Sequence, residues 1–153
     1  MGSQGIRIVS QNRKARHEYN IIDTLEAGIV LLGPEVKSIR EGRINIKDGY
    51  VDIRDGEAWL QNVHISPYPY ATNTAKPDPL RARKLLLHKQ EIKRLAGKVK
   101  ERGFTLIPLK VYISRGKVKV EIALAKGKKL YDKREALKRK TIDREFEKRF
   151  KIR

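Results

Sequence analysis

Residues 104–125 read FTLIPLKVYISRGKVKVEIALA, and this stretch decides the fold. Two apolar-rich runs, 104–114 and 117–125, flank Arg115-Gly116, whose glycine supplies the flexibility of a tight turn. In the second run, apolar side chains occupy every second position from Val118 to Leu124, and Lys117, Lys119 and Glu121 lie on the other parity. This alternation is typical of a strand with one buried and one wet face, so the stretch predicts a β-hairpin.

Shorter patterns upstream predict further strands and two helices. Asp55-Gly56 is a strong hairpin signal, and residues 66–79 hold four of the six prolines, which favours a long loop. We expect a frayed start over residues 1–10 and two strands within 17–32 that break at Ala27-Gly28. These are followed by a helix over 35–41 closed by Gly42 and by a hairpin over 50–63. After the loop we expect a helix over 85–102 that ends at Gly103.

These elements predict a mainly β protein with short helices. About six short strands, without an internal repeat or a parallel strand–helix–strand rhythm, fit an OB-like six-stranded antiparallel barrel over residues 1–125. After Ala125 the composition changes: residues 126–153 hold 13 Lys+Arg against 5 Asp+Glu, with a narrow apolar stripe at Ile142, Phe146 and Phe150. We expect a basic tail that is disordered when free and folds on a partner; the alternative is a docked C-terminal helix.

The charge balance points to a polyanionic partner. The chain carries 36 Lys+Arg and 18 Asp+Glu among 153 residues, a formal net charge of +18. A lysine-rich surface of a heat-adapted protein is the alternative, but heat adaptation usually adds Glu alongside Lys. Without Cys, the sequence excludes disulfides and thiolate metal sites. It shows neither a membrane-length apolar run nor a signal peptide, so we expect a cytosolic protein without membrane contact.

A search for catalytic and metal sites is negative. The histidines at 17, 64 and 88 are dispersed, and Gly127-Lys128 lacks the earlier glycine of a phosphate-binding loop. We therefore expect neither an enzyme nor a cofactor. The run from Asn12 to Tyr19 is more informative, since its three cations could anchor phosphates while an imidazole and a phenol stack on bases. The alternatives are a solvated run and a Tyr19 that packs in the core.

Several longer blocks resemble the small protein B (SmpB) family, the bacterial partners of transfer-messenger RNA. The blocks occur in family order and span nearly the whole chain. They are the run 12–19, Leu25-Glu26-Ala27-Gly28, the stretch GPEVKSIR at 33–40, Asp55-Gly56-Glu57-Ala58, RKLLLH at 83–88, AKGKK at 125–129 and Asp132-Lys133-Arg134.

The resemblance implies an OB-like six-stranded barrel that binds the tRNA-like domain of transfer-messenger RNA. It also implies delivery of that RNA to stalled ribosomes, at the decoding region and messenger RNA channel of the small subunit, for trans-translation. His88 stands where the family often has Asn, and both can form hydrogen bonds. The candidate RNA-binding residues are Asn12, Lys14, Arg16, His17, Tyr19, Glu26, Lys37, Ser38, Arg40, Leu86 and His88. The candidate ribosome-contacting residues of the tail are Lys126, Gly127, Lys128, Lys129, Asp132, Lys133 and Arg134.

Alternatives remain for single residues and for the function. Glu26 either accepts hydrogen bonds from unpaired base edges or forms a surface salt bridge. Glu35, Lys37 and Arg40 share a helical face and either brace the barrel or touch RNA. For the whole chain, the alternative function is a structural or assembly protein embedded in ribosomal RNA. A general single-strand-binding OB module fits less well, since only 7% of the residues are aromatic and stacking platforms need rings.

Overall fold

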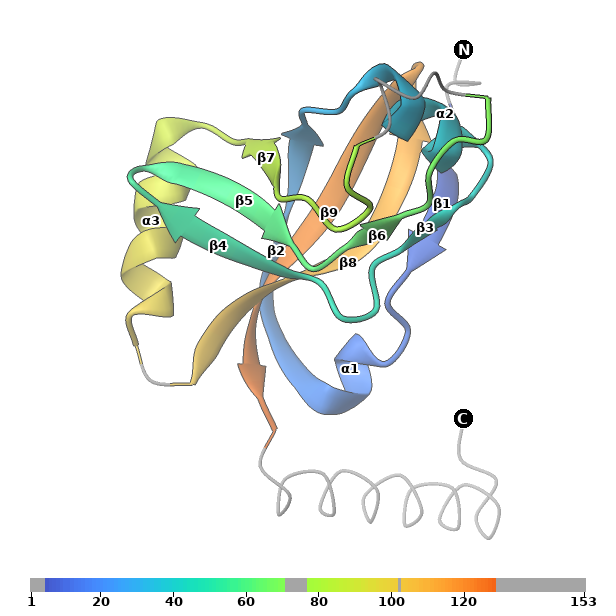
Figure 1. The fold of residues 1–153 in the computed structure, drawn as a ribbon. Helices are drawn as coiled ribbons and strands as arrows, with labels where there is room; N and C mark the ends of the chain where they lie inside the picture. The colour runs from blue at the N-terminus through green and yellow to red at the C-terminus, as the bar shows by residue number, and fades with distance from the viewer. Residues whose placement is uncertain (1–4, 71–76, 102, 129–153) are drawn as a thin grey trace, which may run out of the picture.

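A computed structural model describes residues 5–70, 77–101 and 103–128 of the chain. These residues form nine strands and three short helices, so the mainly β class is confirmed (Figure 1). In chain order the elements are β1 (Arg7–Gln11), α1 (Ala15–Glu18), β2 (Tyr19–Ile29), α2 (Gly33–Arg40), β3 (Ile44–Asn45), β4 (Tyr50–Arg54), β5 (Glu57–Gln61), β6 (His64–Ile65), β7 (Arg83–Leu86), α3 (Lys89–Val99), β8 (Phe104–Ser114) and β9 (Lys117–Gly127).

Seven strands form one curled antiparallel sheet in the order β1-β8-β9-β2-β7-β5-β4. The curl brings β4, at one edge, against β8, the strand next to the other edge, as in an open barrel (Figure 1). The pair β3–β6 forms a separate small sheet beside β1. Among the described strands, no hydrogen-bonded ladder joins the edges β1 and β4, and nine strands stand where six were expected.

Both predicted hairpins are confirmed by their turn geometry. Arg115 and Gly116 have φ values of 52° and 76°, and Asp55 and Gly56 have 51° and 75°. Positive φ at both central residues is the signature of the two-residue turn whose twist matches that of the flanking strands. The turns therefore fix the registers of β8–β9 and β4–β5.

Three strand predictions are wrong. Residues 7–11 are not frayed but form β1, because they pair with the edge of β8. No local sequence pattern indicates this distant partner. The strand β2 runs unbroken through Ala27-Gly28, since Gly28 pairs with both Lys119 and Leu86. The half of β9 that ends at Ala125 is buried on both faces, because α1 and β8 cover its second face with a smaller apolar cluster around Ala15 and Ile107.

The two predicted helices exist, but the second begins later than expected. Pro34 lies in the first turn of α2, and Gly42, with a φ of 76°, follows its end. The residues Leu85 and Leu86 belong to β7 rather than to α3, because β7 fills the gap between β2 and β5. The helix α3 then packs Ile92 and Leu95 against the barrel.

The arrangement separates two ends of the molecule. The helix α1 and the end of β9 lie together at one end, and α2 lies at the other (Figure 1). Within the part of the chain that the structure describes, no helix is long and apolar enough to cross a membrane.

Candidate nucleic-acid interface

A hollow of about 580 Å³ opens beside β2, where β7, β9 and the start of α3 surround it. Its lining includes Glu26 and Gly28 from β2, Lys119 from β9, and Leu86 and His88 from the β7–α3 junction. We call these five residues the Glu26 hollow. The structure therefore brings three of the sequence-predicted RNA-binding residues, Glu26, Leu86 and His88, to one place.

Strand register explains why these side chains share a face. Gly28 lies opposite Leu86 on one side and opposite Lys119 on the other, so all three occupy one row across the sheet. Gly28 leaves room for the leucine, since a Cβ atom there would lie 3.3 Å from the Leu86 Cβ. Leu86 is 53% exposed, so it offers an apolar surface to a ligand rather than to the core.

The Glu26 carboxylate is oriented by two neighbours. It accepts a hydrogen bond from the hydroxyl of Tyr112, a residue of β8 that is only 4% exposed. Burial raises the pKa of Tyr112, and the hydrogen bond to Glu26 raises it further, so the phenol stays protonated and acts as a donor. The ammonium of Lys119 lies 3.9 Å from the other carboxylate oxygen, at the outer limit of an ion pair. The predicted alternative, a surface salt bridge, is therefore present but weak.

Charges of both signs surround the hollow. Lys84 forms an ion pair of 2.6 Å with Glu57, and the backbone amide of His88 donates to the Glu91 carboxylate at 3.0 Å, at the first turn of α3. Carboxylates on the protein repel phosphates, so they do not suit a surface that binds phosphates alone, whereas base edges offer donors as well as acceptors. The mixed charges therefore suit contact with base edges and phosphates together.

The other predicted residues lie elsewhere. Asn12, Lys14 and Tyr19 line a separate hollow of about 260 Å³ around α1, at the opposite end of β2 from Glu26. The end of β9 lies beside them: Tyr19 pairs with Gly127, and the Lys128 amide donates to the Glu18 carbonyl at 3.0 Å. We call residues 12–19 and 126–128 the basic end. Arg16 and His17 are exposed there.

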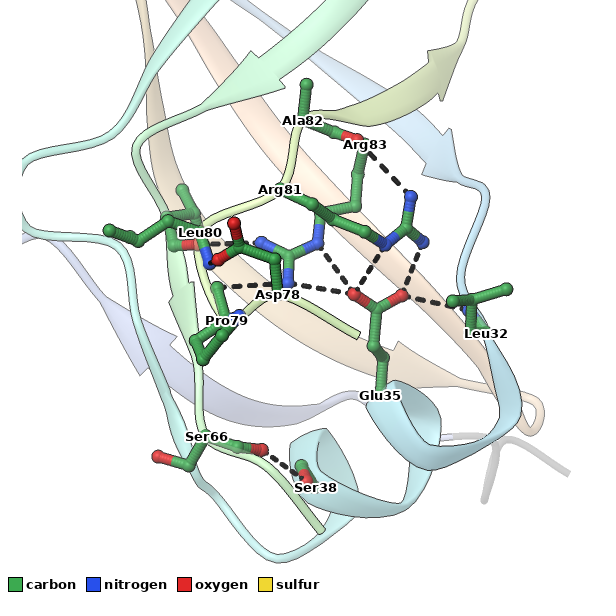
Figure 2. A network of polar contacts seen from close by, with 11 residues as sticks. Leu32, Glu35, Ser38, Ser66, Asp78, Pro79, Leu80, Arg81, Ala82 and Arg83 are labelled. Carbon is green, nitrogen blue, oxygen red and sulfur yellow. Dashed lines mark hydrogen bonds and ion pairs between the residues drawn. The ribbon is translucent and has the colours of Figure 1, made fainter. Parts of the chain in front are cut away.

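The face of α2 divides between bracing and exposed residues. Glu35 is buried and accepts hydrogen bonds from Arg81 and Arg83, so it braces the barrel (Figure 2). Ser38 is buried as well, and its hydroxyl donates to the Ser66 carbonyl at 2.7 Å (Figure 2). Lys37 and Arg40 are exposed, with the Lys37 ammonium 5.5 Å from the centre of the Tyr68 ring. Their contact with RNA stays a prediction, as does that of Ser38.

Comparison with known proteins decides the family. A family model described as "SmpB protein" matches residues 9–152. A protein of Enterococcus faecalis named SsrA-binding protein is 62% identical over 145 residues, covering 95% of this chain and 94% of its own. A namesake from Thermosynechococcus vestitus is 56% identical over 148 residues, covering 97% of both chains. The chain belongs to the SmpB family.

A solved structure supports the same assignment. It is described as "tmRNA-SmpB: a journey to the center of the bacterial ribosome", and its matching chain is 49% identical with a TM-score of 0.67. The match covers 83% of this chain and 92% of that one. The resemblance to the SmpB family is thus confirmed in sequence and in fold.

Two residues at the candidate site of this SmpB-family protein were not predicted from the sequence. Tyr112 and Lys119 touch Glu26 from two different strands, and only the strand order brings them there. The outward parity of β9 placed Lys119 on a wet face, but nothing local linked Tyr112 to Glu26. The tail residues Lys129, Asp132, Lys133 and Arg134 lie outside the described residues, as does the expected tail disorder. Across the described ranges, no three His, Asp or Glu side chains group as metal ligands.

Proposed function

We propose that this chain binds transfer-messenger RNA and carries it to stalled ribosomes, where it supports trans-translation. The observation that carries this proposal is family membership over residues 9–152, together with relatives named SsrA-binding protein and a neighbour described with tmRNA and the bacterial ribosome. The net charge of +18 fits a partner that is RNA. The role is binding and delivery without a reaction of its own, in the cytoplasm where ribosomes work.

The tRNA-like domain of the RNA binds at the Glu26 hollow. Its lining combines an acceptor in Glu26, an apolar surface in Leu86, an imidazole in His88 and a cation in Lys119. Such a set fits the splayed loops of a folded RNA, where unpaired bases expose their edges. Lysines at the rim, Lys84 and Lys89, are placed to hold the neighbouring phosphates.

We assign the basic end to the ribosome because it lies beside the start of the tail, which replaces the expectation that residues 12–19 bind transfer-messenger RNA. It gathers Lys14, Arg16 and His17 beside the point where β9 ends and residues 129–153 continue. Tyr19 and Glu26 are seven residues apart on β2, which corresponds to roughly 20 Å at about 3.3 Å per residue. The two RNA partners thus bind at different ends of one strand, with the decoding region and messenger RNA channel assigned to the basic end and the tail.

The test is the affinity of Glu26→Ala and His88→Ala for the isolated tRNA-like domain, compared with a random RNA duplex of equal length. We expect each change to weaken binding to the tRNA-like domain by about 1–3 kcal/mol, the scale of a lost charge-assisted hydrogen bond. Binding to the duplex should hardly change, since phosphate contacts dominate there. Glu41→Ala, at an exposed carboxylate immediately after α2, is the control. Equal losses on both RNAs would contradict the assignment.

A further inference from the structure

The hydrogen bond between Tyr112 and Glu26 spans three strands of the sheet. Tyr112 lies on β8 and Glu26 on β2, and β9 runs between them. Neighbouring strands lie about 4.8 Å apart, so the phenol has to extend across β9 for its hydroxyl to reach the carboxylate. Tyr112 lies opposite Lys119 on β9, which places its ring on the same face of the sheet as the hollow.

The Tyr112 ring is held in place along its length. It is only 4% exposed although it lies on the face that carries the hollow, and the Lys110 ammonium lies 5.8 Å from its centre. A buried ring in a sheet has few alternative rotamers, so its hydroxyl occupies a fixed point. The Glu26 side chain, by contrast, is 55% exposed and would otherwise move freely.

The contact leaves the two oxygens of Glu26 unequal. One, Oε2, accepts from the phenol. The other, Oε1, has the Lys119 ammonium at 3.9 Å, a distance that leaves room for a further donor. Glu121 lies opposite Glu26 on β9, so a second carboxylate adds negative charge to the same row. A neutral donor such as a base amino group suits this place, whereas a phosphate does not.

We propose that Tyr112 is a positioning residue for RNA recognition, whose hydroxyl holds the Glu26 carboxylate so that its second oxygen accepts from an amino or imino group of an unpaired base. This inference rests on the proposed function and deepens it. The pair Tyr112–Glu26 thereby selects a folded RNA with an exposed base edge over a duplex whose edges are paired. Tyr112 itself does not touch the RNA.

The test removes the hydroxyl alone. In the full chain, Tyr112→Phe should raise the Kd for the isolated tRNA-like domain about tenfold, as expected when a charged group loses a positioning hydrogen bond. In the Glu26→Ala background, the same change should have no further effect, because no carboxylate remains to be positioned. The Kd for a random RNA duplex should stay constant. Tyr70→Phe, at a tyrosine that is 82% exposed, is the matched control.

The outcomes separate the inference from the proposed function. An unchanged Kd for Tyr112→Phe, or an equal loss in the Glu26→Ala background, would overturn the inference while leaving the function intact. A lower melting temperature does not disturb the test, because a purely structural effect would weaken binding in both backgrounds alike. Failure of the unchanged protein to prefer the tRNA-like domain over the duplex would instead refute the proposed function.

Discussion

Glu35 is a buried carboxylate surrounded by donors, with 2% of its surface exposed. Arg81 donates to it at 2.9 and 2.6 Å, Arg83 at 2.9 Å, and the Leu32 amide at 2.9 Å (Figure 2). Burial raises the pKa of Glu35, but the hydrogen bonds from Arg81, Leu32 and Arg83 lower it by more, so the pKa ends below its usual value. The fold therefore favours the charged form of this residue.

Glu35→Gln should lower the free energy of unfolding by about 3–5 kcal/mol at neutral pH, because it leaves Arg83 fully buried without a counter-charge. Since the carboxyl pKa is lower in the folded chain than in the unfolded one, its contribution is complete above about pH 4.3 and is lost as pH falls through the folded value. The gap between the two proteins should therefore shrink in acid. Urea unfolding across this range measures it.

The control for this prediction is an exposed ion pair at the opposite end of α2. Glu41 lies 3.2 Å from Arg43, and both side chains are close to half exposed. Glu41→Gln should cost less than about 1 kcal/mol at any pH, since solvent screens such a pair. A gap between Glu35→Gln and the unchanged protein that stays constant down to strongly acidic pH would contradict the assigned role of Glu35.

Among the elements, the crossing of β4 over β8 depends on a residue without a side chain. Gly49 is buried immediately before β4, and a Cβ atom there would lie 2.6 Å from Val63 Cγ2 and 3.1 Å from Pro108 Cγ. Pro108 belongs to β8, so this close approach is where the curled sheet comes together.

Gly49→Ala should therefore destabilise the fold by about 1–3 kcal/mol, the usual cost of overpacking a core. Gly97→Ala is the matched control with the opposite expected effect, because a Cβ atom at Gly97 of α3 would meet nothing within 4 Å. An alanine in a helix interior gains about 0.5–1 kcal/mol over glycine. Thermal unfolding of both variants should shift in opposite directions, and a shift of the same sign in both would refute the packing argument.

Among the elements, the sequence predicted those that a local residue pattern determines. Asp55-Gly56 and Arg115-Gly116 predicted their hairpins because a turn with two positive φ values favours particular residue types. The strands β1 and β7 were missed because each depends on distant partners. Leu85 and Leu86 fit a helical spacing equally well until β2 and β5 are known to flank them. Pairing across the sheet overrode the local pattern.

For the whole molecule, the candidate site divides over two ends. The resemblance supplied Glu26, Leu86 and His88, and the structure places them together. The resemblance could not show that the run from Asn12 to Tyr19 lies at the opposite end of β2 from Glu26. Only an unbroken β2 keeps the two groups far apart in space. Tyr112 was out of reach for the same reason, since it meets Glu26 only through the strand order.

Cutting the chain after Lys128 should separate the two RNA partners. This cut keeps β9 whole, including the pairing of Gly127 with Tyr19. We expect affinity for the tRNA-like domain to stay within about tenfold, or 1.4 kcal/mol. Tagging of peptides on stalled ribosomes should be lost, because the removed residues 129–153 carry 11 Lys+Arg that can neutralise ribosomal phosphates. A binding assay with the isolated tRNA-like domain measures the affinity, and a translation assay with purified components measures tagging.

The full-length triple change Asp132→Ala, Lys133→Ala and Arg134→Ala is the companion to this cut. It should also abolish tagging, with RNA affinity retained. Near-normal tagging by the shortened chain, or complete loss of its RNA binding, would refute the division between barrel and tail.

The order of strands in the sheet also determines when the sheet can form during biosynthesis. Arg7 of β1 pairs with Ile113 of β8, and Tyr19 of β2 pairs with Gly127 of β9, so the first strands to be translated wait for the last. Such distant pairings form late, because long loops have to close first. A nascent copy that stops before residue 112 has neither the phenol nor the neighbour that β2 needs. We therefore expect that unfinished copies do not compete with finished ones for RNA.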